Sequence, residues 1–530
     1  MAPHPPLPKF EEAAPSEDNG RLIEKRGTER DQHDMLRMGK LQEFRRNFRF
    51  VTIFGFTMVL MATWEAQLLI PEQSANIFGL INGGTAGLIW VYVGTFFGFL
   101  AAIISMAEMA SMAPTTGGQY HWVSEFAPPS AQKFLSYTVG WLCVLGWQVG
   151  NTAIAFLSAQ QISGLIILNN PDYVPKRWHL TLMVIAIVTF CQLFNTFFAH
   201  KLPLVEGIVL VLHLGGFFAI LIPLWVLGER SDAKEVFTTF TDGGGWGSTG
   251  LSCLIGMLSP IFSFIGPDSA THMSEELRDA SKTLPRAMIA TAIVNGALGF
   301  VMLCTFCMFV GNVADILTTP TGQPYIQVFY NVTQSKAGTS VMSSILIVMA
   351  IFGCVTNVAT SSRQVWAFAR DKGLPFSEWL AYLIARQVRP GWDIPLNSVM
   401  ISYMIAVLLS LINIGSTVAF NIITSLGTGA LLSSYIMSVS CVTLKRIRGE
   451  PLLASSFSLG RLGLPLNVFS VLFLTLAFIM TFFPQSSRAE PVAMNWNILV
   501  FGVVVVFSGV YFVVRGRFAY KGPVASVKKD

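Results

Sequence analysis

The sequence has few charged residues and few cysteines, and each shortage excludes a class of protein. Charged residues make up 12% of the 530 residues, about half the share of roughly 25% that soluble globular chains carry. This excludes a disordered chain, a coiled coil and an ordinary soluble enzyme. Seven cysteines in a chain of this length exclude a disulfide-stabilised scaffold. A polytopic membrane protein is the class that remains.

Motifs for ATP-driven or metal-dependent chemistry are also missing. The sequence contains no G-x-x-x-x-G-K-[ST] loop, no H-E-x-x-H and no cysteine pair with zinc-ligand spacing. We therefore expect no enzyme, no cofactor and no metal site. A secondary transporter, a channel or a receptor remains. A channel would need a ring of repeated polar residues, and none is visible in the sequence.

Twelve apolar runs are long enough to cross a bilayer, which takes about 20 residues per helix. They predict an all-α polytopic membrane protein of about twelve transmembrane helices, at 48–71, 84–110, 134–167, 179–199, 202–227, 249–267, 286–312, 338–362, 396–414, 417–444, 463–484 and 495–514. Residues 1–47 are polar and rich in charge and proline, which predicts a mostly disordered cytoplasmic tail. We expect a short basic helix at 34–49 on the membrane surface, and a second cytoplasmic tail at 516–530.

The distribution of lysine and arginine predicts the orientation of the chain. With both termini in the cytoplasm, 29 of the 35 basic residues fall in inner segments, as the positive-inside rule requires. The sequon at Asn331 then lies outside. Topology also explains the net charge of +5, so we expect the lipid bilayer, and no nucleic acid, as a partner. The plasma membrane is the expected location, and a vacuolar or other internal membrane is the alternative.

Two of the runs contain residues that interrupt a helix, and these runs lie five spans apart. In the first, A-T-W-E-A-Q places Glu65 in an apolar stretch, where a carboxylate costs about 2.5–3.5 kcal/mol. In the sixth, Pro260 and Pro267 remove backbone donors and Gly266 lies between them. Asp268 follows directly. Glu65 belongs either to a polar cavity or to the membrane interface, and Asp268 either to a binding site or to a helix N-cap.

Three segments carry a family resemblance. They are F-I-G-P-D-S-A-T-H-M-S-E-E-L-R-D-A-S-K-T-L-P-R-A-M in the sixth run, A-E-M-A-S-M-A-P-T-T-G-G-Q-Y-H-W-V-S-E-F-A-P after the second, and S-S-R-Q-V-W-A-F-A-R-D-K-G-L-P after the eighth. They resemble signatures of the amino acid–polyamine–organocation superfamily, in particular its fungal amino acid/choline branch, with choline, GABA and polyamine carriers. The resemblance implies a transporter domain at 48–515 with a LeuT-type inverted repeat. Repeat one covers 48–227, repeat two 249–444, and two extra helices 463–514.

The resemblance also implies roles for single residues. The bacterial antiporters of this superfamily carry F-x-G-x-E-S-A in the sixth span. Here Ile265 and Gly266 match the backbone that receives the substrate amine, and Asp268 matches an acidic residue linked to gating or proton coupling. Phe262 falls where those antiporters have an aromatic gate, and Phe262 and Phe264 are the two phenylalanines beside a break that are functional candidates. Asn151, in G-W-Q-V-G-N of the third span, falls on an asparagine that contacts substrate.

The first span departs from the family pattern. The G-S-G type motif that receives a substrate carboxylate is absent, and A-T-W-E-A stands near its place. Because Glu65 would repel a carboxylate and attract a cation, a cationic amine is favoured over the usual pose of an α-amino acid. Trp64 offers a cation–π face, and Glu65 is also a candidate for proton coupling. The substrate-binding candidates of this span are Thr63, Trp64, Glu65 and Ala66.

Together these features predict a secondary active transporter of a small amino compound that works by alternating access. The expected substrate is an amino acid, choline, GABA or a polyamine-like compound, and the expected coupling ion is the proton. The alternatives are an exchanger or exporter of a related metabolite in an intracellular membrane, and a nutrient sensor that has lost transport. A homodimer is an open alternative to a monomer.

Several polar residues are predicted to have structural roles. Arg363 and Arg370 follow the eighth run, and we expect them to pair with acids at the inner mouth. His272 lies five residues beyond Pro267 and is expected to make a structural hydrogen bond rather than to titrate. The candidate acids for the two arginines are Glu108, Glu125 and Glu275.

Overall fold

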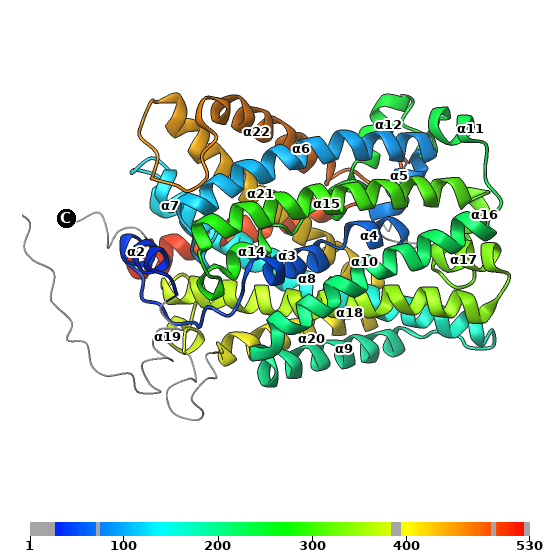
Figure 1. The fold of residues 1–530 in the computed structure, drawn as a ribbon, viewed down its shortest axis with the longest axis horizontal. Helices are drawn as coiled ribbons and strands as arrows, with labels where there is room; N and C mark the ends of the chain where they lie inside the picture. The colour runs from blue at the N-terminus through cyan, green and yellow to red at the C-terminus, as the bar shows by residue number, and fades with distance from the viewer. Residues whose placement is uncertain (1–26, 70–74, 383–393, 489–493, 524–530) are drawn as a thin grey trace, which may run out of the picture.

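The computed structural model describes residues 27–69, 75–382, 394–488 and 494–523. Within these residues, twelve helical segments are long and apolar enough to cross a membrane. They run along one another in a single elongated bundle (Figure 1). The predicted all-α polytopic fold is therefore confirmed.

Two of the twelve spans are broken. The first consists of α3 (Phe50–Met61) and α4 (Thr63–Leu68), and the sixth of α12 (Thr249–Gly256), α13 (Leu258–Phe264) and α14 (Ser269–His272). The other spans are built on α6 (Gly84–Met112), α8 (Gln132–Asn169), α9 (Arg177–Phe197), α10 (Leu202–Leu227), α15 (Ala280–Phe309), α18 (Lys336–Arg370), α20 (Leu396–Gly415), α21 (Thr417–Ile447), α22 (Gly463–Met480) and α23 (Asn497–Tyr511). The two breaks are five spans apart, as the sequence predicts.

Short elements join the spans. The helices are α2 (Glu29–Arg37), α5 (Ala75–Ile81), α7 (Gln119–Phe126), α11 (Ala233–Thr238), α16 (Val313–Leu317), α17 (Pro324–Thr333), α19 (Ser377–Leu380) and α24 (Arg517–Ala519). Single turns lie at η1 (Ala199–Lys201), η2 (Ser274–Glu276), η4 (Gly460–Leu462) and η5 (Phe512–Gly516). Two short strands, β1 (Asn82–Gly83) and β2 (Thr241–Asp242), pair antiparallel, with Asn82 opposite Asp242 and Gly83 opposite Thr241.

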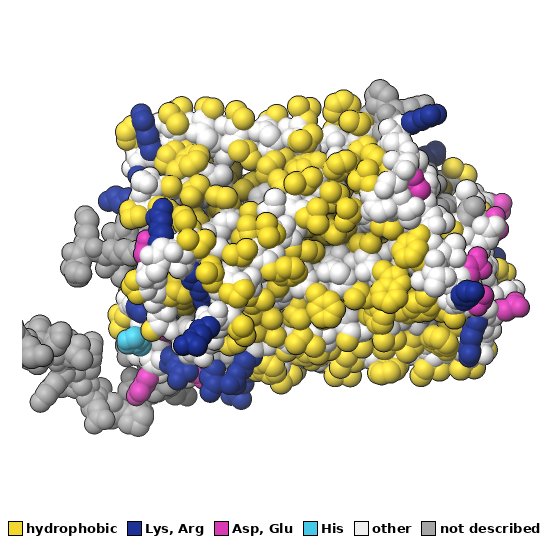
Figure 2. All heavy atoms as spheres, turned by 90° about the horizontal axis from the view of Figure 1, so that it is seen from above, with side chains coloured by type: hydrophobic (Ala, Val, Ile, Leu, Met, Phe, Trp, Pro, Cys, Tyr) yellow, Lys and Arg dark blue, Asp and Glu magenta, His cyan; other side chains and the backbone are white. Residues whose placement is uncertain are grey.

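The surface is apolar along the middle of the bundle and charged at its two ends. Figure 2 shows hydrophobic side chains over the central part of this face, with Lys, Arg, Asp and Glu gathered at the ends. Large apolar side chains such as Phe97, Leu182 and Leu472 are more than half exposed, which is typical of helices that face lipid tails. The end that carries α2, α7 and α19 (Figure 1) is called the inner end below.

The segment before the first span packs against the inner end. In α2, Asp31 accepts hydrogen bonds from the backbone amides of Asp279 and Ala280, at 3.0 and 3.1 Å. The backbone amide of Phe48 donates to the carbonyl of Glu276, and that of Arg278 donates to the carbonyl of Phe48. Residues 27–47, which the sequence assigns to a mostly disordered tail, are thus held onto the start of α15.

The basic helix predicted at 34–49 is wrong in its bounds. The observed helix begins one residue after Thr28, because Thr28 and Asp31 form a capping box that fixes this start. After Arg37 the chain leaves the helix in a turn and is mostly irregular, and Phe44 and Phe48 occupy buried positions. Burial of these two aromatic rings outweighs helix continuation on a surface.

The two ends of the bundle allow a test of orientation. Asn331 in α17 and Lys372 after α18 lie at opposite ends of the 35-residue helix α18. We expect a cysteine placed at 331 to react with an impermeant maleimide in intact cells, and a cysteine at 372 to react only after permeabilisation, because basic residues are retained inside. Labelling of position 372 in sealed cells, with position 331 protected, would reverse the predicted orientation.

Candidate functional site

The first and sixth spans are both interrupted, for different local reasons. Ala62 separates α3 from α4 in a left-handed conformation, with φ 43° and ψ 42°. In the sixth span α13 ends at Phe264, and Ile265 is extended. Gly266 follows with φ 121°, which L side chains avoid, and Pro267 cannot donate a helical hydrogen bond. The predicted break at Gly266 and Pro267 is therefore confirmed.

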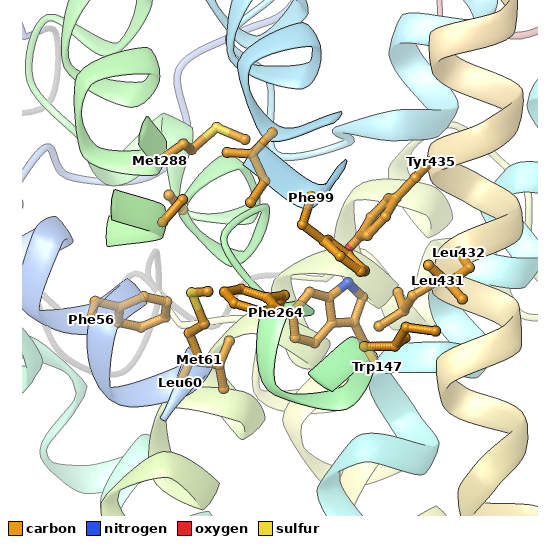
Figure 3. Close-up of a cluster of buried hydrophobic side chains, with 14 of the residues drawn as sticks. Phe56, Leu60, Met61, Phe99, Trp147, Phe264, Met288, Leu431, Leu432 and Tyr435 are labelled. Atoms are coloured by element: carbon orange, nitrogen blue, oxygen red, sulfur yellow. The ribbon is translucent and has the colours of Figure 1, made fainter. Parts of the chain in front are cut away.

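The two breaks lie against each other. The hydroxyl of Thr63 donates to the carbonyl of Ser263 at 2.9 Å, so the start of α4 satisfies a backbone acceptor near the end of α13. Gly266 faces Met61, whose Cα would be 3.7 Å from a Cβ built on that glycine. Figure 3 shows Met61 beside Phe264, with the ring of Phe99 close by. The fold thus brings the break that contains Thr63 against the break that contains Gly266, and both are predicted site residues.

The aromatic residue at the break is Phe264 and not Phe262. Phe264 is buried and packs against the rings of Tyr92, Phe96 and Phe99 at centroid distances of 5.0, 5.8 and 5.9 Å. Phe262 is 41% exposed on the surface of the bundle. Two residues along a helix turn by about 200°, so only one of the two rings can face inward. The role predicted for Phe262 as a gate is therefore not supported by its position.

Glu65 is buried in α4, and its carboxyl group contacts the imidazole of His213 in α10. Its Oε1 lies 2.7 Å from His213 Nδ1. His213 Nε2 lies 3.1 Å from Oδ1 of Asn295 in α15, and Asn295 Nδ2 donates to the carbonyl of Met58 at 3.0 Å. Glu65 is thus buried and has a polar partner, which does not fit the alternative of a residue at the membrane interface. It begins a buried polar chain that links the first, fifth and seventh spans.

Two buried polar atoms beside this pair make no hydrogen bond within the described residues. They are Glu65 Oε2 and Trp64 Nε1. The Trp64 ring lies 5.6 Å from the His213 ring and 5.9 Å from Phe217. The other predicted residues of this span, Thr63 and Ala66, are buried as well. A carboxylate oxygen, an indole and an imidazole therefore meet at one buried point.

Sequence reasoning missed His213. The signal that would have indicated it is the pair Glu206 and His213 in a 26-residue helix that contains no other ionisable side chain. Seven residues make about two turns, so the two side chains share one face. Both are buried: Glu206 accepts a hydrogen bond from Thr356 in α18 at 2.8 Å, and His213 pairs with Glu65.

Asp268 follows the second break, but its side chain caps no backbone amide of α14. Its two oxygens accept hydrogen bonds from Gln119 Nε2, at 2.6 Å, and from the hydroxyl of Tyr435, at 2.5 Å. His272 Nε2 lies 3.9 Å away, and His272 Nδ1 lies 2.9 Å from the carbonyl of Thr116, a hydrogen bond of the structural kind predicted for this residue. The N-cap alternative is therefore replaced by a buried link between the sixth span, α7 and α21.

The side chain of Asn151 is hydrogen-bonded to α18. Its Nδ2 donates to Ser361 Oγ at 2.8 Å, and its Oδ1 accepts from Asn357 Nδ2 at 2.6 Å. Both partners belong to α18, so these hydrogen bonds hold α8 and α18 together. The described contacts of Asn151 thus do not join it to Glu65 or to Gly266.

Ion pairs close the inner end. Arg370 forms a bidentate pair with Glu275 at 2.8 and 2.9 Å, which confirms one predicted partner. Arg363 pairs with Glu276 at 2.8 Å instead of a predicted acid, and Glu108 pairs with Arg446. Glu125 lies 3.6 Å from His121.

The N-terminal segment takes part in this closure. Lys40 pairs with Asp371, which also accepts from the Tyr120 hydroxyl at 2.9 Å. Burial alone would raise the pKa of Asp371, but the charges of Lys40 and Arg370 outweigh it and hold the pKa below its usual value. The ionised carboxylate of Asp371 thus links the N-terminal segment and α7 to the end of α18.

Comparison with known proteins shows the family of the chain. A sequence model described as amino acid permease matches residues 48–506. The chain belongs to the amino acid permease family. The permease is 31% identical to a protein of Macrophomina phaseolina named as an amino acid/polyamine transporter, over 84% of this chain and 96% of that one. It is 26% identical to a choline transporter of Saccharomyces cerevisiae, over 89% and 82% of the two chains.

A further relative is amino-acid permease 2 of Neurospora crassa, 27% identical over 92% of this chain and 88% of that one. The resemblance carried by the three sequence segments is confirmed, and so is the choice of a transporter over an enzyme. The permease is an integral membrane protein. Among the described residues no group of three or more His, Cys, Asp or Glu side chains is placed to hold a metal ion.

Proposed function

We propose that the permease is a secondary active transporter that moves a small cationic amino compound across the plasma membrane by alternating access. The observation that carries this proposal is the buried carboxylate of Glu65 next to the break at Ala62, with one oxygen that has no hydrogen-bond partner among the residues that the structure describes. Intramembrane carboxylates are costly and are kept for function. An ammonium group is the charge that this oxygen would bind, with Trp64 as an aromatic wall.

Two further observations support this substrate class. The carbonyl of Ile265 lies just beyond α13, where helical pairing stops, and is a candidate acceptor for an amine. Relatives of the permease are named as amino acid/polyamine and choline transporters. In this proposal Ile265 and Gly266 receive the amine by their backbone, and Glu65 provides the counter-charge.

The arrangement of the breaks supports a LeuT-type inverted repeat. α3–α4 and α12–α14 are interrupted near their centres and stand in equivalent places of two five-span units. Broken helices that meet at mid-membrane are the usual site of substrate in such transporters. Alternating access would then consist of movements of these half-helices around a fixed site.

The experiment that tests the function is uptake in a yeast strain that lacks its own permeases. Radiolabelled choline, spermidine, arginine, GABA and a neutral amino acid are supplied at equal concentration. We expect uptake of at least one cationic compound above the empty-vector level, and a change in its rate when the proton gradient is collapsed. Uptake of the neutral amino acid alone would contradict the cationic site. Binding of a compound without its uptake would favour the sensor alternative.

Asp268 is proposed as the residue that couples protonation to movement of the sixth span. Substitution of Asp268 by Asn removes a charge that Gln119 and Tyr435 now share. We expect the variant to bind substrate with little change but to transport more slowly, and the rate of uptake to vary less with pH between 5 and 7. Initial uptake rates at saturating substrate measure this. The same pH profile in wild type and Asp268→Asn would remove Asp268 from the coupling step.

A further inference from the structure

We propose that the Glu65–His213 pair holds either one proton or the substrate cation, but not both, so that the permease exchanges a cation against a proton. This inference rests on the proposed function, because it takes Glu65 as the counter-charge of the substrate. It adds a proton site at His213 and a direction of coupling, since the two ions would cross in opposite directions. The hydrogen bonds around His213 carry it.

Those hydrogen bonds determine how many protons the pair holds. The carbonyl of Met58 can only accept, so the atom of Asn295 that faces it at 3.0 Å is the amide nitrogen. The oxygen of Asn295 therefore faces His213 Nε2 and must accept a proton from it. His213 Nδ1 then meets Glu65 Oε1 at 2.7 Å, a distance that requires one shared proton.

The pair is therefore neutral as a whole. The shared proton resides either on His213, giving an imidazolium and a carboxylate, or on Glu65, giving a neutral ring and a carboxylic acid. Without it, the lone pair of Nδ1 and a carboxylate oxygen would face each other in a buried site, which is strongly unfavourable. A second cation next to the protonated pair would meet no net negative charge. The proton and a substrate ammonium thus compete for one carboxylate.

Within the described residues, no other ionisable side chain is hydrogen-bonded or ion-paired to Glu65 or His213. The helices packed against α4 and α10 are α3, α13, α15, α17 and α18, together with the turn η1. Within the described residues His213 is the ion-pair partner of Glu65. The remaining ionisable side chains on these elements are Glu206, Tyr325, Tyr330, Cys304, Cys307 and Cys354, and, close to the ends of the spans, His200, Lys201, Lys282, Arg286, Lys336, Arg363 and Arg370.

The exchange step balances in charge and protons. When an ammonium group reaches Glu65, its positive charge replaces that of the imidazolium, and His213 loses the Nδ1 proton to the side that the site faces. His213 keeps its Nε2 proton on Asn295. On release of the substrate to the other side, one proton returns to the pair. One cation therefore moves against one proton per cycle, with no covalent bond made or broken.

The test measures protons released on binding. Choline is the probe, because its quaternary ammonium carries no exchangeable proton on nitrogen. Purified full-length permease in weakly buffered detergent solution at pH 6.5 is mixed with choline, a pH-sensitive dye reports released protons, and radiolabelled choline reports occupancy. Spermidine replaces choline if choline does not bind. We expect close to one proton released per cation bound.

The variants separate this mechanism from a structural role of the histidine. In wild type the affinity for choline should fall as the pH is lowered, because protons and choline compete for one carboxylate. In His213→Gln, which binds without releasing a proton, the affinity should not depend on pH. His200→Gln changes an exposed histidine of η1 and should behave as wild type. Wild-type binding without proton release overturns the exchange and leaves the proposed function standing. Failure of choline, spermidine and arginine to bind overturns the proposed function itself.

Discussion

Replacement of Glu65 by glutamine is expected to weaken the apparent affinity for a cationic substrate by about 10- to 100-fold. A hydrogen bond to a charged group contributes about 1.5–3 kcal/mol, and each 1.4 kcal/mol is about a factor of ten in affinity. The amide of glutamine keeps the shape of the side chain but supplies no counter-charge. The concentration dependence of initial uptake, or direct binding of the radiolabelled cation, measures the change.

Glu206→Gln is the matched control for this prediction. Glu206 is a second buried carboxylate near the first span, and its hydrogen bond goes to Thr356 of α18. We expect this variant to keep the wild-type affinity for the cation. If Glu65→Gln also keeps it, Glu65 serves only to hold His213, and the preference for a cationic substrate loses its main support.

Substitution of Glu275 by glutamine is expected to destabilise the inner end by about 3–5 kcal/mol, because it leaves the guanidinium of Arg370 buried without its counter-charge. Glu275 is completely buried, and both its oxygens accept from Arg370. The expected result is a clear fall in the midpoint of thermal unfolding of the purified protein in detergent. Glu43→Gln is the control: Glu43 lies 3.9 Å from the same arginine, but its side chain is 36% exposed, so we expect a loss of less than about 1 kcal/mol.

The same pair predicts how stability depends on pH. Burial alone would raise the pKa of Glu275, but the charges of Arg370, Lys40 and Arg46 outweigh it and hold the pKa below the ordinary value of 4.5. A depressed pKa stabilises the folded state above the ordinary value, and this contribution is lost as pH falls through the lowered pKa. Wild type should therefore lose stability in acid below pH 4.5 more steeply than Glu275→Gln. Equal melting points for Glu275→Gln and Glu43→Gln would mean that water reaches Arg370.

The twelve spans and the second break follow from local chemistry that the sequence displays directly. An apolar run of about 20 residues has one low-energy arrangement in a bilayer, because each backbone group must be paired within its own helix. The break at Gly266 and Pro267 follows from one residue that tolerates φ 121° and one that lacks an N–H group. Both features depend on few neighbours, and both are where the sequence predicts them.

The structure differs from the sequence-based expectations where the direction of a side chain or a partner distant in the chain decides the outcome. Phe262 and Phe264 are equivalent in composition, and only the packing of Phe264 against α6 shows which one faces inward. Asn151 matches a substrate-contacting position in a motif, yet its hydrogen bonds go to α18. The chain after Arg37 is polar in sequence. Phe44 and Phe48 nevertheless anchor it, because the packed spans provide buried positions for their rings.

The sequence by itself determined that this protein is a twelve-span permease, that its first and sixth spans carry an acid at or near a break, and that basic residues gather on one side. Only the tertiary structure decided what Glu65 faces. Its partner His213 is 148 residues away in the chain, and Asn295 is a further 82 residues on. Apolar length and backbone chemistry are properties of a single segment, whereas the identity of a buried counter-charge depends on how three helices pack, and no local pattern records it.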